Sequence, residues 1–298
     1  MVAVGDGACL ILGASGTVGR HLTARLREST LELLALSRRD PATDDGYIRW
    51  IQGDLYGDVP DLSKAQINSI YSVGPLDGFA RWLRTSDLPS LRRVVALSSM
   101  SLEVKAQSSD LAERGLAVKL AGAERDVIDF CSGRDIACVV LRPTLIYGGG
   151  SDRSLSLLAK LGQRWHLFPS IPGATGLRQP IRADDLASAC VAAMEIDSQP
   201  PKIFRVGGAE QLTFSAMLSR TRVGLPVWTI PVHIPLRMAQ LALRLLRLLP
   251  LWRHLDQGLA DRLQQDQIVD NEPAMRELGW QPKEFDVALP ETFLNKKS

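Results

Sequence analysis

The feature that most constrains the fold is a glycine-rich segment, residues 13–19, with glycine at positions 13, 16 and 19. It follows an uncharged apolar run at residues 8–12, which is typical of a strand buried on both faces of a parallel sheet. After it, Val18, Leu22 and Leu26 recur at helical spacing. Strand, glycine turn and helix in this order predict a corner that holds the pyrophosphate of a dinucleotide, because glycine lets the backbone approach and the helix N-terminus attracts negative charge. The residues expected to hold it are Gly13, Ser15, Gly16, Thr17, Val18 and Gly19.

Apolar segments and helical patterns alternate along the first half of the chain. The further predicted strands are residues 31–36, 47–52, 67–73, 93–97 and 137–141, with a helix at 109–131 before the last of them. A helix at 184–194 and another strand at 202–206 follow. This alternation predicts an α/β fold, a doubly wound parallel (Rossmann) sheet that binds ligands at the carboxyl ends of its strands.

The pattern changes after Pro143, where three successive glycines at 148–150 break the chain. We therefore expect two parts. Residues 1–145 with 181–206 form the NAD(P)-binding Rossmann domain, and residues 207–298 with 146–180 form a smaller, mostly helical substrate-binding lobe. A chain of 298 residues is long enough for both cores.

Charge and composition exclude several classes of function. A net charge of +2 gives no reason to expect nucleic acid as a partner, and the four histidines lack metal-ligand spacing. The four cysteines lie in apolar stretches without a C-x-x-C pair, as in a reducing compartment. No secretory leader or membrane-spanning run is recognisable, so we expect a cytoplasmic protein without a metal.

One amphipathic segment, residues 235–249, has two interpretations. Leucines line one side, whereas Arg237, Arg244 and Arg247 fall near each other on another. A basic amphipathic helix can lie on a membrane surface. It can also pack on the substrate lobe with its arginines in water, and this second interpretation is the one that we favour.

The residues that end the second predicted strand indicate which dinucleotide is bound. Ser37, Arg38 and Arg39 stand there, near the position where a carboxylate would hold the ribose hydroxyls of NAD. Two guanidinium groups suit a 2′-phosphate instead, so the sequence predicts NADP(H) in preference to NAD(H). The alternative is that both arginines are a solvated strand end.

Several further motifs occur in an order typical of one family. Gly53-Asp54-Leu55 follows the third strand, and the other segments are residues 141–148, 177–187 and 277–282. Together with the glycine segment, they resemble the extended short-chain dehydrogenase/reductase family, the group of nucleotide-sugar epimerases and dehydratases, over nearly the whole chain. The resemblance implies that Asp54 and Leu55 lie at the adenine. It implies that Ser72, Gly74, Ser98 and Pro143 line the nicotinamide side.

The catalytic pair of that family is missing. Its members use a Ser or Thr after strand five and a Tyr-x-x-x-Lys on the next helix, whose lysine lowers the tyrosine pKa. Ser99 keeps the hydroxyl, but no lysine in this chain has a tyrosine four residues before it. If the chain is aligned on Glu124, Leu116 occupies the tyrosine position and Leu120 the lysine position. If it is aligned on Lys119, Gly115 occupies the tyrosine position.

Other groups must therefore do the acid–base work if there is any. The catalytic candidates are Ser99, Lys119 and Tyr147, with Lys105 and Arg114 also within reach of the cleft.

Arg178 is the candidate for substrate binding, because the resemblance implies that it grips a diphosphate. The alternative is an ion pair with Asp184 or Asp185.

The leading hypothesis is an epimerase/dehydratase-like oxidoreductase that binds NADP(H), has non-standard catalytic residues, and acts on a nucleotide-sugar-like or other anionic small molecule. The alternative from another class is a non-catalytic NADP(H)-binding sensor or accessory protein. A third hypothesis is a protein attached to a membrane surface through residues 235–249. The sequence leaves a homodimer open.

Overall fold

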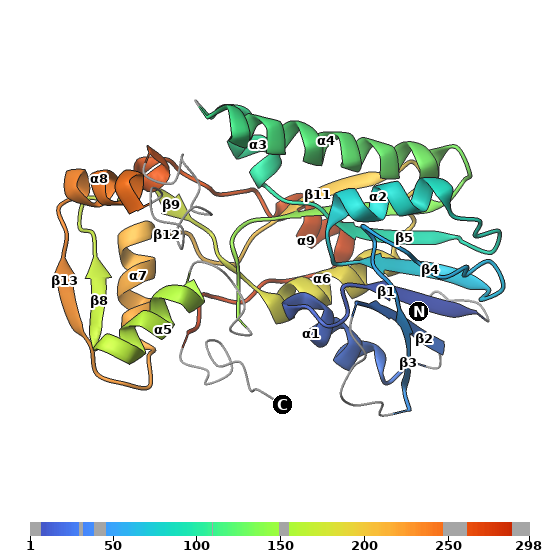
Figure 1. Ribbon diagram of the computed structural model, residues 1–298, viewed down its shortest axis with the longest axis horizontal. Coiled ribbons are helices and arrows are strands. Elements are labelled where there is room, and N and C mark those ends of the chain that lie inside the picture. Colours follow the sequence, from blue (N-terminus) through green and yellow to red (C-terminus); the bar gives the residue numbers. More distant parts are fainter. Residues whose placement is uncertain are drawn as a thin grey trace.

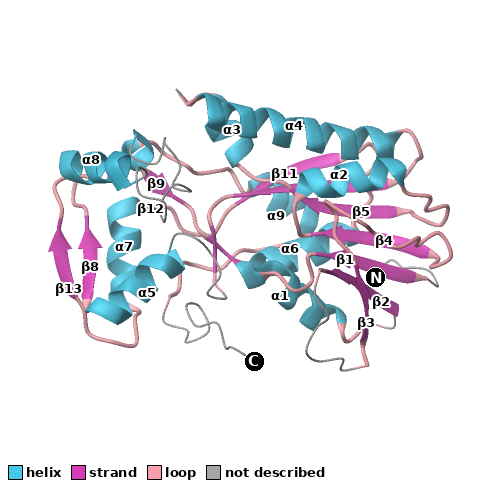
Figure 2. Cartoon of the chain, in the orientation of Figure 1, coloured by secondary structure: helices cyan, strands magenta, loops and turns pink. Residues whose placement is uncertain are grey.

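The computed structural model describes residues 7–29, 32–38, 46–108, 110–148, 155–246 and 261–287. A parallel sheet with flanking helices forms one part of the molecule, and a smaller lobe forms the other (Figures 1 and 2). The seven strands of the sheet follow the order β11-β6-β5-β4-β1-β2-β3. Their bounds are β1 (Ala8–Leu12), β2 (Glu32–Ser37), β3 (Ile48–Gln52), β4 (Ile67–Ser72), β5 (Arg93–Leu97), β6 (Ala137–Pro143) and β11 (Lys202–Val206).

Every pairing in this sheet is parallel, which confirms the predicted doubly wound α/β fold. The strand order reverses between β1 and β4, which are neighbours in the sheet although two strands separate them along the chain. Ligands bind at such a reversal, outside the carboxyl ends of the strands. Gly13 directly follows β1, and Gly74 stands two residues after the end of β4.

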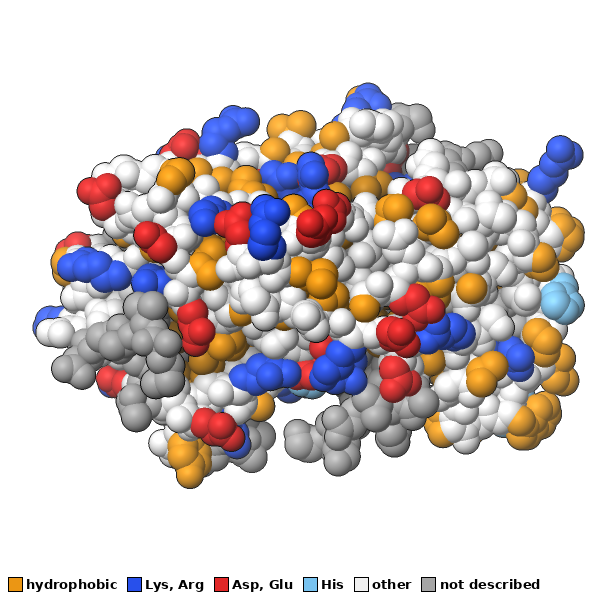
Figure 3. All heavy atoms as spheres, turned by 180° about the vertical axis from the view of Figure 1, so that it is seen from behind, with side chains coloured by type: hydrophobic (Ala, Val, Ile, Leu, Met, Phe, Trp, Pro, Cys, Tyr) orange, Lys and Arg blue, Asp and Glu red, His pale blue; other side chains and the backbone are white. Residues whose placement is uncertain are grey.

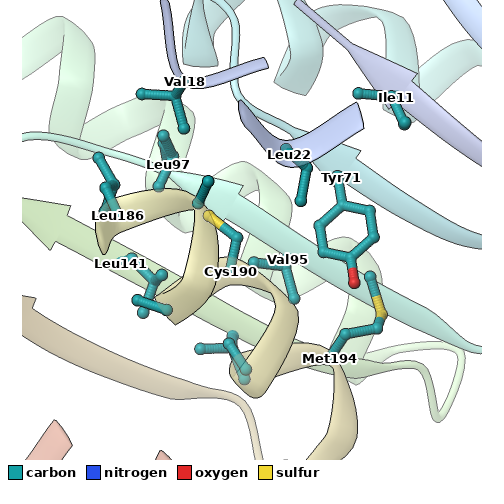
Figure 4. Packing of buried hydrophobic residues seen from close by; sticks show 14 of the residues in the cluster. Ile11, Val18, Leu22, Tyr71, Val95, Leu97, Leu141, Leu186, Cys190 and Met194 are labelled. Atoms are coloured by element: carbon teal, nitrogen blue, oxygen red, sulfur yellow. The ribbon is translucent and has the colours of Figure 1, made fainter. Parts of the chain in front are cut away.

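Helices cover both faces of the sheet, as the alternation of side chains along the strands requires. On one face, Cys9 and Ile11 of β1 pack with α1 (Thr17–Leu26), α6 (Ala183–Glu195) and α9 (Glu272–Leu278). On the other, Leu10 and Leu12 pack with α2 (Leu76–Thr85) and α4 (Leu111–Ser132). Figure 4 shows the first of these cores, with side chains of α1 and α6 meeting those of the central strands. The short helix α3 (Ser101–Ala106) packs on α4.

The four cysteines are buried and unpaired, in agreement with the expectation that they are packing residues. Burial raises the pKa of the Cys190 thiol to about 12 and that of the Cys9 thiol to about 11. The neutral thiol is therefore the stable form of both, and neither is poised for nucleophilic chemistry.

The second lobe combines helices with short strand pairs. Its helices are α5 (Leu155–Trp165), α7 (Phe214–Val223), α8 (Leu236–Leu246) and the 3-10 helix η3 (Asp261–Gln264). Three two-stranded pairings accompany them: β7 (Ile146–Tyr147) with β10 (Ile181–Arg182), β9 (Leu177–Arg178) with β12 (Leu212–Thr213), and β8 (Leu167–Ser170) with β13 (Ile230–His233). Its core is built around Tyr147, Phe168, Met217 and Phe285. No helix in the described parts of the chain is both long and apolar enough to cross a membrane.

The segment after η3 returns to the sheet. Ala274 and Leu278 of α9 and the following Trp280 belong to the core beneath α6. The Trp280 indole Nε1 donates to the carbonyl of Asp185 at 3.0 Å. Residues 272–280 thus pack on the Rossmann side, although the predicted boundary places all of 207–298 in the second lobe. The division into two domains otherwise stays a prediction.

Candidate functional site

The glycine corner brings the ends of β1 and β4 into direct contact. Gly13 has φ +88°, and a Cβ built on it would lie 2.7 Å from the backbone nitrogen of Gly74. A Cβ on Gly19 would lie 2.1 Å from the carbonyl oxygen of Gly13. The amide of Gly16 donates to that same oxygen at 2.9 Å and closes the turn. Glycine is therefore required at positions 13 and 19 by the backbone itself.

The N-terminus of α1 presents backbone donors at this corner. Its N-cap residue is Gly16, which supplies no side-chain cap, and the first turn contains no acidic residue. The amides of Val18 and Gly19 belong to the first turn, whose N–H groups have no acceptor within the helix. Ser15 and Gly16 are exposed in front of it, and Thr17 is half-buried as the first helical residue. The corner thus has the donors and the positive dipole end that a pyrophosphate needs.

Two buried hydroxyls lie at the same edge of the sheet. Ser72 ends β4 and Ser98 directly follows β5, and the register pairs Ser72 with Ala96, two residues before Ser98. Both side chains therefore emerge on one face of the sheet, the face covered by α2 and α4. Neither Oγ has a hydrogen-bond partner in the described structure. A buried hydroxyl without a partner costs about 1–3 kcal/mol, so a polar ligand group at this edge suits both.

The predicted adenosine end is assembled from the ends of β2 and β3. The amide of Gly53 donates to the carbonyl of Ser37 at 2.9 Å, which places the residues after β3 beside those after β2. Arg38 is exposed and forms no ion pair with any described residue, whereas Arg39 lies outside the described residues. Asp54 is half-buried, and its Oδ1 accepts from the amide of Tyr56 at 3.0 Å.

Leu55 belongs to the core beside α2. Its side chain is buried among the residues that pack α2 on the sheet, and its carbonyl accepts from Arg81 Nη2 at 2.8 Å. Leu55 therefore positions the loop that carries Asp54.

Ser99 and Pro143 meet at the ends of β5 and β6. The Ser99 Oγ accepts from the amide of Ser101 at 3.1 Å, at the start of α3. The carbonyl of Pro143 accepts from the amide of Met100 at 3.0 Å, so the end of β6 lies against the turn that carries Ser99. The structure thus brings together these two sequence-predicted residues and the buried Ser98.

Lys119 is directed toward α2. Its Nζ lies 2.6 Å from Asp77 Oδ2, and the hydroxyl of Tyr56 donates to Asp77 Oδ1 at 2.7 Å. Burial alone would raise the pKa of Asp77, but the hydrogen bonds from Lys119 and Tyr56 outweigh burial and lower it. This ion pair ties α4 to α2, and the ammonium of Lys119 is engaged in it.

Tyr147 lies in the core of the second lobe. It is 1% exposed, and its ring makes an edge contact with Phe285, with the ring centroids 4.8 Å apart. Its hydroxyl accepts from the amide of Asp286 at 3.2 Å, and burial raises its pKa to about 12. These surroundings are those of a packing residue, and they give no support to an acid–base role.

Arg178 is buried and bonded to backbone. Its guanidinium donates to the carbonyls of Leu177, Gln265 and Arg262 at 2.8, 2.7 and 2.6 Å. Burial lowers its pKa to about 10. The alternative ion pair with Asp184 or Asp185 is not formed by these described side chains. Asp184 is held by Arg25 at 2.6 Å and by Arg182 at 2.9 Å, and Asp185 Oδ2 accepts from the amide of Lys283 at 3.0 Å. Arg178 fixes β9 to the segment around η3, and its contact with a substrate stays a prediction.

A buried ion pair that sequence reasoning missed crosses between the two parts of the molecule. Arg262 Nη1 in η3 donates to Glu113 Oε1 at 3.0 Å and to Oε2 at 2.8 Å, at the start of α4. Glu113 is 4% exposed and Arg262 7%. In the sequence, a glutamate in the first turn of a helix is explained by the helix dipole alone, so Glu113 does not stand out as half of an ion pair. Arg262 belongs to no sequence motif. The separation of 149 residues left no signal of the pair.

The inward face of α4 carries Glu124, one of the two residues on which the missing catalytic pair can be aligned. Glu124 is buried and accepts from Arg142 Nε at 3.1 Å and from its Nη2. Leu120 precedes Glu124 by four residues and is half-buried, whereas Lys119 is exposed toward α2. The residue on the same helix face as Glu124, one turn before it, is thus a leucine and not a lysine. Leu116, one turn earlier, has no group that can exchange a proton.

A separate hollow of about 670 Å³ lies away from the glycine corner. Gln179, Asn271, Asp270 and Glu272 are among its lining residues, and no sequence-predicted site residue is. The side chains of Gln179 and Asn271 are engaged in hydrogen bonds to the backbone: Gln179 Nε2 and Asn271 Nδ2 both donate to the carbonyl of Gly208. We therefore place the candidate site at the glycine corner and not in this hollow.

Comparisons with known proteins agree with this fold. The family model of the NAD dependent epimerase/dehydratase family matches residues 9–74, from β1 to the glycine after β4. MoeE5 in complex with UDP-glucuronic acid and NAD is similar in structure, with a TM-score of 0.69, 20% identity and coverage of 96% of both chains. No curated protein matches the sequence significantly.

Two further solved structures have the same fold. UDP-glucuronic acid 4-epimerase from Bacillus cereus, in complex with UDP-glucuronic acid and NAD, gives a TM-score of 0.68 at 16% identity, covering 96% of this chain and 98% of the other. dTDP-glucose 4,6-dehydratase from Bacillus anthracis, in complex with NAD, gives 0.68 at 10% identity, with 97% and 94% covered. The resemblance is thus confirmed: residues 9–74 match the NAD dependent epimerase/dehydratase family, in a chain with the fold of these epimerases and dehydratases.

Proposed function

We propose that this chain binds NADP(H) at the corner between β1 and β4 and is an oxidoreductase- or epimerase-type enzyme for a small anionic substrate. The observation that carries the proposal is the arrangement at one sheet edge. Gly13 touches Gly74 without room for a side chain, and the buried hydroxyls of Ser72 and Ser98 stand beside them without partners. A dinucleotide laid across this edge would place its pyrophosphate at α1 and its nicotinamide end toward β5. The similar structures named with NAD support a dinucleotide as the ligand of this fold.

The preference for the phosphorylated dinucleotide rests on Arg38. It follows β2 at the predicted ribose position, it is exposed, and it has no acidic partner in the described part of the chain. A guanidinium can hold a 2′-phosphate in two hydrogen bonds. The similar structures are named with NAD, so the proposal attributes the preference to this residue and not to the fold.

The bound cofactor would supply hydride transfer, and the chain would supply position and protons. Ser99 follows β5 at the edge where the nicotinamide is expected. Its Oγ accepts from the Ser101 amide, so the hydroxyl proton stays available to a substrate oxygen. No phenol stands beside it on α4, where Leu116 and Leu120 occupy the two positions. A proton would therefore pass between Ser99 Oγ and water, a weaker arrangement than a tyrosine of lowered pKa.

Binding without turnover is the second candidate function, and α4 carries the observation that favours it. Its inward face presents Ala117 and Leu120, and Lys119 is held by Asp77. A sensor or accessory protein needs the glycine corner and Arg38 but no acid–base pair. The two functions differ only in whether a substrate is converted to product at the bound cofactor.

Calorimetry with NADPH, NADP⁺, NADH and NAD⁺ tests the cofactor assignment. We expect the wild type to prefer the phosphorylated pair by at least about tenfold, and Arg38→Ala to abolish that preference without weakening NADH. Arg84→Ala, at the far end of α2, is the matched control and should keep the preference. Binding of none of the four would refute the proposal. Once binding is shown, the absorbance of the reduced nicotinamide and chromatographic detection of product, with carbonyl and nucleotide-sugar substrates, decide between enzyme and sensor.

A further inference from the structure

The outer end of the second lobe exposes an unusual set of apolar side chains. Most of the exposed large apolar residues in the described chain belong to this lobe. In β8 and β13, Ile230 pairs with Leu167, and Val232 follows on the same face. Phe168, the next residue of β8, points the opposite way and is fully buried. We call the outward set the end surface; its members are Trp165, Leu167, Trp228, Ile230, Val232, Met238, Leu241 and Leu245, which are 39–69% exposed.

Local contacts hold Trp228 outward. The Trp228 ring stacks on His166, with centroids 4.6 Å apart and an interplanar angle of 22°. The His166 ring Nδ1 lies 2.9 Å from the carbonyl of Trp228. Trp228 is 69% exposed and Trp165 60%, although a tryptophan of a folded protein usually buries most of its ring. Such ordered, exposed indoles are typical of side chains at the interface between lipid and water.

The two sequence stretches that carry the end surface contain basic but no acidic side chains. The sequence contains no Asp or Glu between Asp152 and Asp184, nor between Glu210 and Asp256. The same stretches contain arginines throughout, among them Arg164 beside Trp165 and Arg237 at the start of α8, both exposed. Glu210, the acidic residue that borders the second stretch, is paired with Arg220. Seen from behind, hydrophobic side chains gather at the end of the lobe, and no acidic side chain appears there (Figure 3).

We propose that the end surface docks on a membrane rich in anionic lipid. An apolar face with tryptophans and arginines and without carboxylates gains both from apolar burial and from attraction to negative headgroups. The helix α8 would lie in the plane of the interface with Met238, Leu241 and Leu245 toward the acyl chains. The proposed membrane-binding surface thus includes residues 235–246 together with β8 and β13. The amphipathic pattern of the helix alone indicates only the first of these parts. The proposal is independent of the cofactor assignment.

Flotation with lipid vesicles tests the docking surface in the full chain. We expect the wild type to float with vesicles of phosphatidylcholine and phosphatidylglycerol but not with phosphatidylcholine alone, and to be released by high salt. Arg164→Glu with Arg237→Glu should lower the partition coefficient by at least about tenfold. Trp228→Ser with Ile230→Ser should lower it comparably through lost apolar burial. The matched control is Tyr47→Ser with Arg49→Glu. Arg49 lies in the edge strand β3, Tyr47 directly precedes that strand, and both are exposed, so this variant should float as the wild type does.

Thermal unfolding and NADPH titration of each variant confirm that it is folded. Three results would overturn the proposal: no flotation with anionic vesicles, equal flotation of the wild type and both end-surface variants, or binding that ignores the lipid charge. A concentration-dependent dimer that Trp228→Ser with Ile230→Ser abolishes, without vesicle binding by the wild type, would instead assign the surface to a second copy of the chain.

Discussion

Glu113 and Arg262 form a buried ion pair in which one guanidinium nitrogen contacts both carboxylate oxygens, at 3.0 and 2.8 Å. Glu113 lies in the first turn of α4, and Arg262 lies in η3 of the second lobe. The carbonyl of Arg262 also accepts from Arg178 Nη2 at 2.6 Å, so the pair continues into β9. A connection from helix α4 to the second lobe thus runs through charged side chains and not through apolar packing.

Breaking this pair from one side should be costly. Glu113→Ala leaves the Arg262 charge buried without its partner, and we expect a loss of about 3–5 kcal/mol in the free energy of unfolding, measured with urea. Replacing both residues by apolar ones, Glu113→Leu with Arg262→Met, should restore most of it, because no uncompensated charge remains. A double variant as unstable as Glu113→Ala would contradict the assignment of that loss to the uncompensated charge of Arg262.

The glycine corner gives a prediction about cofactor binding. Gly13→Ala forces a Cβ into a left-handed backbone position and to within 2.7 Å of the Gly74 nitrogen. We expect it to abolish NADPH binding in calorimetry and to destabilise the fold by more than about 1 kcal/mol. Gly122→Ala, in α4 with no atom within 4 Å of its Cβ, is the matched control. It should keep the affinity and stabilise the chain by about 0.5–1 kcal/mol, and equal behaviour of the two variants would contradict the role of Gly13.

The central strands of the sheet could be predicted from the sequence because they are buried on both faces. β1, β5 and β11 match their predicted bounds: β1 is wholly apolar, and β5 and β11 add one and two basic residues to a short apolar run between turns. Helix α2 was not predicted, although Leu76, Phe79, Ala80 and Leu83 are spaced for a helix. Its first turn follows Gly74-Pro75, a dipeptide typical of turns. The strands β8 and β13 were missed because they are short and pair only with each other.

The site was predictable only where one local segment builds it. The corner at Gly13 needs no distant partner, so spacing alone reveals it. The partners of Arg178 and Lys119 are set by tertiary contacts: Arg178 meets the carbonyl of Gln265, 87 residues away, and Lys119 meets Asp77 on another helix. Such contacts leave no periodic trace in a single sequence.

The unpartnered hydroxyls at the sheet edge allow stability and binding to be separated. Ser98→Ala removes a buried polar atom that has no partner in the described structure, so we expect unchanged or higher thermal stability without ligand. If the hydroxyl serves the cofactor, the same variant should bind NADPH about 5–10-fold more weakly. Ser69→Ala, buried in the middle of β4 away from the edge, is the control and should leave the affinity unchanged. Wild-type affinity in Ser98→Ala would remove Ser98 from the binding site.

The pH dependence of stability should depend on Asp184, which joins α6 to α1. Burial alone would raise the pKa of Asp184, but hydrogen bonds from Arg182 and Arg25 outweigh burial and lower it from 3.8 to about 2. Because the folded-state pKa lies below the unfolded one, ionised Asp184 stabilises the fold above about pH 4, and this contribution is lost as the pH falls toward 2. We expect ionised Asp184 to contribute at most about 2 kcal/mol to the free energy of unfolding, because the partial exposure of its side chain weakens the interaction. Urea unfolding should therefore show Asp184→Asn less stable than the wild type at neutral pH, with the gap closing between pH 4 and pH 2. The exposed Asp87→Asn should follow the wild type throughout. A gap for Asp184→Asn that stays constant with pH would contradict the assignment, because a merely steric defect does not titrate.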